Sequence, residues 1–403
     1  YLDVKQKHSD CIVFFRLGDF YEMFFEDAEL VSRELELTLT GKDCGLSERA
    51  PMCGVPYHAA NVYVAKLIEK GYKVAICEQM TDPSLSKGLV EREVVRIITP
   101  GTVADPAMLD EKRNSYILCA LFRGKEVALA YTDVSTGEFL IHQLKDAAQR
   151  LRDELNRIAP QEILTNDEAT LAAYLQQTLA VTQLPASAFE RKNAEGQLLR
   201  HFHAASTAAL GLEPRDLRAL AAGALLFYLN DTQKNSLAHI AQLTPYQGGD
   251  TMFLDRATRR NLELTETLRS GERRGSLLWL LDRTETAMGA RQLRTWVEEP
   301  LINRERIETR LDMVEAFCRD YPAADALGEA LAGVADPERL LGKISYNSLN
   351  ARDCLALLQS LKRVPGIRTL LCGFDIPAAQ ALAHPLSPLQ GLCDLLERAI
   401  HPD

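Results

Sequence analysis

Residues 11–25 read CIVFFRLGDFYEMFF and indicate the type of domain with which the chain begins. The first seven of them, Cys11–Leu17, are mostly apolar and predict a buried strand. Gly18 and Asp19 break this run, and residues 21–37 then show the apolar periodicity of a helix. A strand that passes through a short turn into a helix predicts a mixed α/β domain.

The mixed pattern continues to about residue 105, where we expect the first domain to end. Glycines and prolines predict a loop at residues 41–57, and a helix is expected at residues 59–70. Two β-rich stretches follow at residues 73–77 and 94–98.

Two further domains are expected after this one. Alternating apolar residues predict three strands at 116–122, 127–133 and 138–143. A helix at 145–158, a short strand at 162–165 and further helices up to about residue 231 are predicted after them. They predict a second α/β domain at residues 106–245. From residue 254 onward the pattern is almost entirely helical, which predicts an all-α domain at residues 246–403.

The composition is that of a soluble globular protein. Hydrophobic residues make up 46% of the 403 residues and charged residues 25%, which excludes a disordered chain. No apolar run is long enough to predict a membrane span. The nine cysteines are scattered and form no CxxC pair, so we expect reduced, buried thiols and no disulfide or zinc framework. The chain opens at Tyr1 without an initiator Met, so we expect it to be a piece of a longer protein.

The net charge of −10 argues against a protein that binds nucleic acid through a broad basic surface. Residues 1–105 carry 12 Lys and Arg against 17 Asp and Glu. Residues 256–294 carry nine Arg against five acidic residues, in a segment with a helical pattern. We expect this arginine-rich segment to form ion pairs between helices more than contacts with DNA.

Phe20 and Glu22 have two interpretations. In the first, Asp19 and Glu22 form a capping box at a helix start, and Phe20, Phe24 and Phe25 pack the helix on the strand. In the second, Phe20 projects from the turn and acts as an apolar wedge between DNA base steps, which costs least where the pair is already weak. Glu22 would then exchange a hydrogen bond with the disturbed base and contribute discrimination, because a carboxylate cannot attract phosphate.

The surroundings of Phe20 resemble the MutS family of bacterial DNA mismatch repair proteins. The resemblance rests on GDFYEMF at 18–24, GVPYHA at 54–59, VAICEQ at 74–79, SKG at 86–88, VER at 90–92, VVRIITPGT at 94–102, LDRATRRNLEL at 254–264 and PL at 300–301. These motifs are densest in the first hundred residues and extend over the whole chain.

The resemblance implies a mismatch-recognition domain at residues 1–105, an RNase H-like connector domain at 106–245 and the first part of a helical core, or lever, domain at 246–403. It also implies that Phe20 stacks on the mispaired or unpaired base and that Glu22 hydrogen-bonds to it while the duplex kinks. A kink costs less at a mismatch, so deformability supplies a specificity that no fixed base code could give.

Lys42, Arg92 and Arg96 lie in segments that match the family and are candidates for contacts with the DNA backbone. For each of them, a solvated surface charge is the alternative interpretation.

Family members hydrolyse ATP with Mg²⁺ in a domain that contains a phosphate-binding P-loop. The Gly-Lys pairs of this chain are Gly41-Lys42, Gly124-Lys125 and Gly342-Lys343, and none is followed by Ser or Thr. We therefore expect no catalytic residue, metal or cofactor in this chain, with the clamp and ATPase domains outside it.

The partners implied by the resemblance are mismatched duplex DNA, a second copy of the full-length protein, MutL and the sliding clamp. The implied location is the bacterial cytoplasm, in association with the nucleoid, and no membrane is involved.

Two alternatives remain open from the sequence. The meander at residues 116–143 would suit a metal-dependent nuclease if Asp133, Glu138, Asp153 and Glu154 formed a two-metal site. Asp133 is equally explained as the residue that begins the turn at 133–137. The second alternative is a scaffold that binds only partner proteins.

Overall fold

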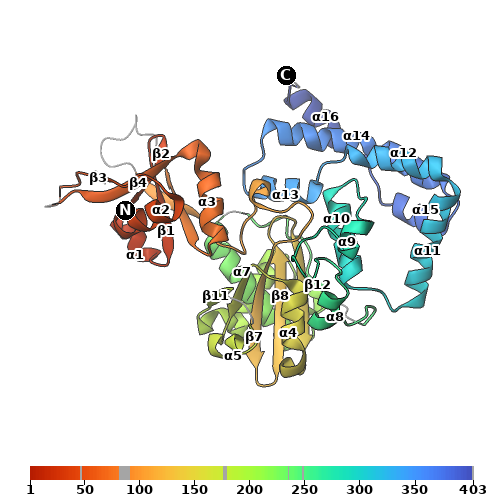
Figure 1. The fold of residues 1–403 in the computed structure, drawn as a ribbon, viewed down its shortest axis with the longest axis horizontal. Coiled ribbons are helices and arrows are strands. Elements are labelled where there is room, and N and C mark those ends of the chain that lie inside the picture. The colour runs from red at the N-terminus through yellow and green to blue at the C-terminus, as the bar shows by residue number, and fades with distance from the viewer. Residues whose placement is uncertain (46–47, 81–90, 176–178, 235, 247–248, 402–403) are drawn as a thin grey trace. The chain divides into compact units, whose positions relative to one another are not determined.

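The computed structural model describes residues 1–45, 48–80, 91–175, 179–234, 236–246 and 249–401, and the SKG motif at 86–88 lies outside them. These residues form two compact units, described separately below (Figure 1). The first unit contains Tyr1–Leu109, Ser115–Arg152 and Ile158–Thr244, and the second contains Asp110–Asn114, Asp153–Arg157 and Pro245–Asp403. The first holds two α/β sheets and the second is helical, which confirms the expected fold class.

The first sheet has six strands in the order β3-β4-β2-β1-β5-β6 (Figure 1). The strands are β1 (Cys11–Leu17), β2 (Phe20–Phe24), β3 (Thr40–Lys42), β4 (Ala50–Pro56), β5 (Lys73–Gln79) and β6 (Arg92–Ile98). The helices are α1 (Leu2–Lys7), α2 (Phe25–Leu35), the 3₁₀ turn η1 (Tyr57–Ala59) and α3 (Ala60–Glu69).

The two faces of this sheet are covered differently. On one face, buried residues of β1 and β2 such as Phe14 and Met23 share a core with Val31 of α2 and Leu67 of α3. On the other face, β1, β5 and β6 form a smaller core with partly buried residues at the N-terminus, including Val4. Because α1 has only six residues, it covers only part of that second face.

The structure corrects two predictions in this domain. Residues 21–24, expected to begin the helix at 21–37, belong to strand β2, and the helix starts only at Phe25. The apolar and aromatic residues of this stretch also satisfy the two-residue period of a strand, which the pairing with β1 and β4 selects. The expected loop at 41–57 instead contains β4 and the end of β3, whose prolines and glycines hid the strand pattern.

The second sheet has the order β11-β10-β7-β8-β9-β12. The strands are β7 (Tyr116–Arg123), β8 (Glu126–Asp133), β9 (Glu138–Leu144), β10 (Glu162–Thr165), β11 (Ala180–Gln183) and β12 (Thr244–Pro245). The helices are α4 (Ala147–Ile158), α5 (Glu168–Ala172), α6 (Arg191–His201) and α7 (Leu217–Gln233), with the 3₁₀ turns η2 (Pro106–Met108), η3 (Ala186–Phe189) and η4 (Thr207–Leu210). The predicted meander is confirmed, whereas β11 was missed because it is short and lies within a stretch expected to be helical.

A buried carboxylate joins the end of the first sheet to the second. Glu162, which has no exposed surface, accepts hydrogen bonds from the Tyr228 hydroxyl at 2.7 Å, the Thr182 hydroxyl at 3.2 Å and the Gly101 amide at 3.2 Å. The Thr99 hydroxyl also donates to it. A side chain on Gly101 would place its Cβ 2.8 Å from the Cβ of Glu162, so only glycine fits here. The segment after β6 is thus joined to the domain of the second sheet by these polar contacts as well as by the covalent backbone.

The second unit is helical from residue 256 onward, as predicted. Its helices are α8 (Arg256–Asn261), α9 (Leu277–Leu281), α10 (Ala287–Glu298), α11 (Arg304–Arg319), α12 (Tyr321–Ala332), α13 (Pro337–Ser345), α14 (Ala351–Gly373), α15 (Pro377–Ala383) and α16 (Gln390–Ala399). Side-chain oxygens cap many of the N-termini, and α14 begins with a complete capping box between Asn350 and Asp353. None of the helices described is long and apolar enough to cross a membrane.

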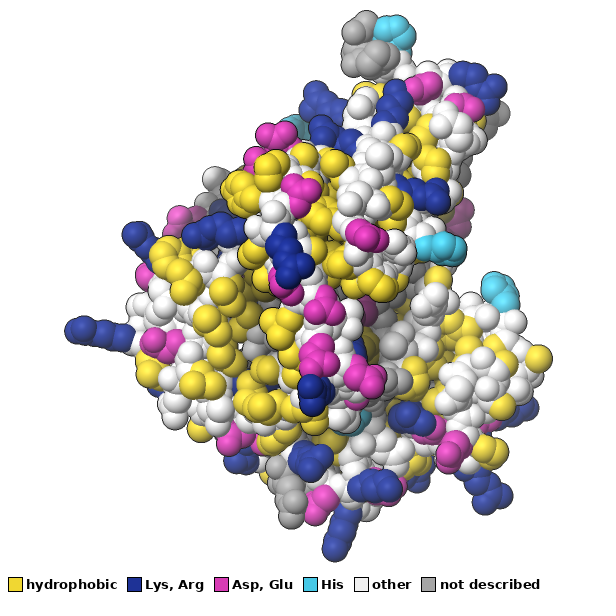
Figure 2. Space-filling view, turned by 90° about the vertical axis from the view of Figure 1, so that its right-hand side faces the viewer, with side chains coloured by type: hydrophobic (Ala, Val, Ile, Leu, Met, Phe, Trp, Pro, Cys, Tyr) yellow, Lys and Arg dark blue, Asp and Glu magenta, His cyan; other side chains and the backbone are white. Residues whose placement is uncertain are grey.

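Many large apolar side chains of the helical unit are exposed. They include Leu277, Trp279, Leu280 and Leu281 of α9, Trp296 of α10, Leu311 and Val314 of α11, and Leu392 and Leu395 of α16. Figure 2 shows hydrophobic side chains spread over the face presented there, with acidic and basic side chains between them. Apolar exposure on this scale is typical of a surface that packs against further protein.

All nine cysteines carry free thiols, as expected, but they are not uniformly buried. Five are buried, and burial raises the pKa of the Cys53 and Cys77 thiols to about 11. Cys44, Cys318 and Cys372 are exposed.

The Glu162 contacts predict a large effect of one substitution. Glu162→Ala should lower the free energy of unfolding by about 3–5 kcal/mol, because it leaves three buried donors and the partly buried Thr182 hydroxyl without their acceptor. Urea denaturation followed by circular dichroism measures this. Glu168→Ala, which removes an exposed carboxylate from α5, is the control and should change stability by less than about 0.5 kcal/mol. Equal small effects of both substitutions would show that the junction does not depend on Glu162.

Candidate nucleic-acid interface

A two-residue turn sets the position of Phe20. Gly18 and Asp19 connect β1 to β2 as an antiparallel hairpin in which Leu17 pairs with Phe20. Gly18 has a φ of +57°, a left-handed conformation that glycine adopts without steric cost. Phe20 is therefore the first residue of its strand, directly at the tip of the hairpin.

Phe20 and Glu22 lie on one face of the sheet. Successive side chains of a strand point to opposite faces, so the buried Tyr21 and Met23 face the core while Phe20 and Glu22 point the other way. Phe20 has 46% of its surface exposed, whereas Phe24 at the other end of the same strand has 6%. The capping-box interpretation is wrong, because residues 19–22 are not helical and α2 has Phe24 at its N-cap. The core-packing interpretation holds for Phe24 and fails for Phe20.

Glu22 is held in an ion pair with Lys42. The Lys42 Nζ lies 2.6 Å from Glu22 Oε2, with 41% of the Lys42 side chain and 16% of the Glu22 side chain exposed. The two residues come from β3 and β2, which both pair with β4, so the ion pair spans β4. Gly54 of β4 is directly opposite Glu22, and an added Cβ there would lie 3.5 Å from Glu22 Cγ. The sequence placed both residues in the candidate site but did not predict this contact.

A second polar cluster, which the sequence analysis did not identify, supports the turn. The Arg16 guanidinium lies 3.8 Å from the centre of the Tyr57 ring and donates to the Gly18 carbonyl at 2.5 Å. The Tyr57 amide donates to the Asp19 carbonyl at 2.9 Å, and 46% of the Tyr57 surface is exposed. Arg16 precedes the turn and Tyr57 lies in the GVPYHA motif, but only the pairing of β2 with β4 brings them together.

Glu78 of β5 connects this cluster to the buried Tyr21. The Tyr21 hydroxyl donates to its carboxylate, and an Arg16 nitrogen lies 3.9 Å from the same group. Burial and the bond to Glu78 raise the pKa of Tyr21, which therefore remains a donor at neutral pH. These contacts hold the base of the β1–β2 hairpin in a single arrangement.

Arg92 and Arg96 have different surroundings. The Arg92 guanidinium lies 5.2 Å from the Phe15 ring centre and donates to the Arg16 carbonyl at 2.9 Å. Phe15 pairs with Glu22 across β1 and β2, so Arg92 belongs to the neighbourhood of the Phe20 face. Arg96 donates to the Gln233 side chain at 3.1 Å and to the Thr102 carbonyl at 3.3 Å. Its guanidinium is engaged where the first sheet meets the connector.

Within the arginine-rich segment at 256–294, Arg291 confirms the expected ion pairing between helices, whereas Arg294 pairs within its own helix. Arg291 is buried and contacts Asp336 at 2.7 Å and Glu338 at 2.6 Å. Arg294 contacts Glu298 at 3.3 Å, within α10.

The Asp133 carboxylate stabilises the turn that begins at this residue. Its buried carboxylate accepts from the Ser115 amide at 3.0 Å, the Ser135 amide at 2.8 Å and the Ser135 hydroxyl at 2.7 Å. Glu138 accepts from the Tyr116 hydroxyl at 2.6 Å, and Glu154 pairs with Arg157 at 2.8 Å. Across the residues described, no group of three or more His, Cys, Asp or Glu is arranged to hold a metal ion. The structure offers no support for the nuclease alternative.

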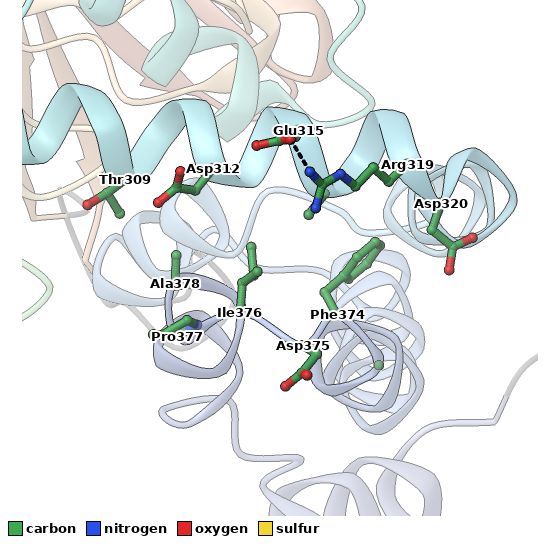
Figure 3. Close-up of a pocket in the computed structure, with 12 residues that line it drawn as sticks. Thr309, Asp312, Glu315, Arg319, Asp320, Phe374, Asp375, Ile376, Pro377 and Ala378 are labelled. Atoms are coloured by element: carbon green, nitrogen blue, oxygen red, sulfur yellow. Dashed lines mark hydrogen bonds and ion pairs between the residues drawn. The ribbon is translucent and has the colours of Figure 1, made fainter.

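A cavity of about 560 Å³ lies in the helical unit beside α11 and the segment that joins α14 to α15 (Figure 3). Its charged lining residues are Asp312, Glu315, Arg319, Asp320 and Asp375. The single guanidinium is bonded to Glu315 (Figure 3). With four carboxylates against one arginine, the cavity would repel a phosphate backbone.

Comparisons with known proteins give one consistent family. Models of MutS domain I, MutS domain II and MutS domain III match residues 1–107, 115–241 and 257–403. The chain is 46% identical to the DNA mismatch repair protein MutS of Ruminiclostridium cellulolyticum, over 99% of the chain and 46% of that protein. It is also 46% identical to the proteins of the same name from Acetivibrio thermocellus and Symbiobacterium thermophilum, over 100% and 99% of the chain and 47% of each relative. The chain thus spans about half the length of these relatives.

The exposure of Phe20 predicts that it contributes little to stability. Phe20→Ala should lower the free energy of unfolding by less than about 1 kcal/mol, because the ring is not part of a packed core. Phe14→Ala, in the adjacent strand and with no exposed surface, should cost about 3–5 kcal/mol. Urea denaturation of both variants measures the difference, and a similar large loss for both would restore the core-packing interpretation of Phe20.

Proposed function

Because this chain belongs to the MutS family of DNA mismatch repair proteins, we propose that it recognises mispaired and unpaired bases in duplex DNA. The observation that carries the proposal is the exposed Phe20 at the tip of a β-hairpin, with Glu22 on the same face of the strand. The names of the relatives support mismatch repair as the process. Since the chain spans about half of each relative, the activities and partners of the whole protein are included here as proposals.

Phe20 acts in this proposal as a wedge. An aromatic ring that enters a base step must not be packed in the protein core, and the backbone that carries it must be held rigidly in place. Phe20 meets both requirements, since it is exposed and begins a strand that pairs with β1 on one side and β4 on the other. Unstacking a base step costs a few kcal/mol and less at a mismatch, so the wedge enters preferentially where pairing is already weak.

Glu22 supplies a hydrogen bond to the base that Phe20 displaces. It lies two residues along the same strand and on the same face, which is the arrangement needed for two side chains to reach one base. A carboxylate repels the DNA backbone, so its contribution is to discrimination and not to general affinity.

The DNA backbone is contacted by basic side chains on the same domain. Lys42 and Arg92 lie near the Phe20 face and are the better supported candidates. Arg96 is proposed with less structural support, because its guanidinium is engaged with Gln233 and the Thr102 carbonyl. The excess of 17 acidic residues over 12 basic ones in residues 1–105 fits a domain in which DNA deformation, and not a basic groove, provides specificity.

We propose that residues 1–105, 106–245 and 246–403 are the mismatch-recognition, connector and first lever segments. The exposed apolar side chains of α9, α10, α11 and α16 suit a lever that packs against further helices of a longer protein. The homodimer and the partners MutL and sliding clamp are proposed for that longer protein, together with a cytoplasmic, nucleoid-associated location.

ATP and Mg²⁺ are assigned to the longer protein as well, because the residues of this chain do not fit them. Gly41-Lys42 lies in strand β3, Gly124-Lys125 joins β7 to β8, and Gly342-Lys343 lies inside helix α13. A P-loop requires a glycine-rich turn between a strand and a helix N-terminus, followed by Ser or Thr. We therefore assign this chain no catalytic step.

The wedge role predicts that Phe20→Ala abolishes the preference for mismatched DNA. Fluorescence anisotropy with a G·T duplex and its matched control at low salt measures the ratio of the two dissociation constants. The ratio should fall to about one, because without the ring the binding free energy no longer depends on how easily a base step is unstacked. Phe253→Ala, which removes an exposed phenylalanine from the helical unit, is the control and should leave the ratio unchanged. Retention of the preference in Phe20→Ala would contradict the proposal.

The role of Glu22 predicts a different pattern for Glu22→Ala. Discrimination should weaken while affinity for the matched duplex rises, because a negative charge that faces the phosphates is removed. The same anisotropy titrations detect both changes. Glu29→Ala removes an exposed carboxylate from α2 and should change neither quantity. Unchanged binding of Glu22→Ala to both duplexes would exclude a role for this carboxylate.

A further inference from the structure

Lys42 neutralises the carboxylate that is proposed to read the mispaired base. The distance of 2.6 Å between Lys42 Nζ and Glu22 Oε2 is that of a charge-assisted hydrogen bond. The pair forms although the two residues lie on strands separated by β4. In the protein without DNA, Lys42 therefore occupies Glu22 Oε2, and the Lys42 ammonium already has a counter-charge.

On β4, Gly54 is opposite Glu22 and Ala50 is opposite Lys42, so a small residue lies directly opposite each member of the pair. Met52 lies between these two positions on the same face of β4. The Lys42 ammonium also lies 5.5 Å from the centre of the buried Phe24 ring, which adds a favourable cation–π contact. The other cations near this face are held elsewhere, since Arg92 donates to the Arg16 carbonyl and Arg16 to the Gly18 carbonyl.

We propose that Lys42 is a specificity-determining residue whose contact with the DNA backbone depends on what Glu22 binds. On a matched duplex the base donors are already paired, so Glu22 keeps Lys42 and Lys42 contributes nothing to phosphate binding. At a mismatch, the displaced base donates to Glu22 in place of Lys42. The released ammonium then contacts a phosphate, so recognition of the base by Glu22 switches on a backbone contact. This inference rests on the function proposed above and deepens it.

In this proposal, Glu22 and Lys42 each have a partner on matched DNA and on mismatched DNA. On matched DNA they bind each other, and at a mismatch Glu22 binds the base and Lys42 binds a phosphate. A carboxylate close to DNA without a counter-charge would oppose binding, and a lysine bound to every phosphate backbone would favour matched and mismatched DNA equally. The ion pair avoids both outcomes. Because 41% of the Lys42 side chain is exposed, it can reorient without unfolding of the strand that carries it.

A double-mutant cycle tests this dependence. Dissociation constants are measured by anisotropy for a G·T duplex and its matched control, with the wild-type chain, Lys42→Met, Glu22→Gln and the double variant. In the wild-type background, Lys42→Met should weaken binding to the mismatched duplex about tenfold, the size of one charge-assisted hydrogen bond. Matched binding should weaken by clearly less, because there the only loss is the counter-charge of Glu22. In the Glu22→Gln background Lys42 is free in both complexes, so Lys42→Met should weaken both equally.

Salt dependence gives an independent reading of the same exchange. The slope of log affinity against log salt should be steeper by about one for the mismatched than for the matched duplex, and Lys42→Met should remove this difference. Lys70→Met is the matched control, since Lys70 forms a similarly exposed ion pair with Glu34 at 2.8 Å on another part of the same domain. It should alter neither the ratio of affinities nor the difference in slopes.

The outcomes separate this inference from the function on which it rests. If the wild type discriminates, Phe20→Ala does not, and Lys42→Met weakens both duplexes equally or neither, then the coupling is wrong and the wedge stands. If the wild-type chain shows no mismatch preference, the proposed function fails and this inference fails with it. Urea denaturation of Lys42→Met confirms that the fold is retained, as expected for an exposed side chain.

Discussion

The turn at Gly18 and Asp19 determines where the residues of the candidate interface point. It closes a hairpin of only two loop residues, so Phe20 begins a strand at the tip of the sheet. In a strand, residues two apart share a face, whereas in a helix they point about 200° apart. The extended conformation of this segment is what places Phe20 and Glu22 on one face, as the proposed contact with a single base requires. The same geometry brings Lys42 to Glu22 across β4, since β2 and β3 both pair with that strand.

The rest of the first unit keeps this tip in place. The face of the sheet opposite Phe20 is filled by residues of β1 and β2 packed against α2 and α3. Arg16, Tyr57 and Glu78 connect the turn to β5 and to the end of β4. At the far end of the sheet, the buried Glu162 and the Arg96–Gln233 contact join the domain to the connector. The proposed wedge role requires such support, because a force on Phe20 would have to be transmitted to its strand and not absorbed by a flexible loop.

Much of this fold could be predicted from the sequence, and the errors have local causes. Strand β1, the meander of β7, β8 and β9, and the helical second unit follow from periodicity alone. Strand β2 was mistaken for a helix start because its apolar residues satisfy both periods, and β4 was hidden by Pro51, Gly54 and Pro56. Phe20 and Glu22 were paired through the family resemblance, and the structure places both on one face of β2, where their proposed role stays a prediction. The Lys42–Glu22 contact could not be predicted, because it depends on the pairing order of three strands.

The central claim is that Phe20 enters and kinks the duplex at a mismatch. Its most direct test is energy transfer between dyes at the two ends of a short duplex, measured as the chain is added. The claim predicts a shorter end-to-end distance for a G·T duplex than for its matched control, and no shortening with Phe20→Ala. Shortening that persists in Phe20→Ala, or tight mismatch binding without any shortening, would contradict it.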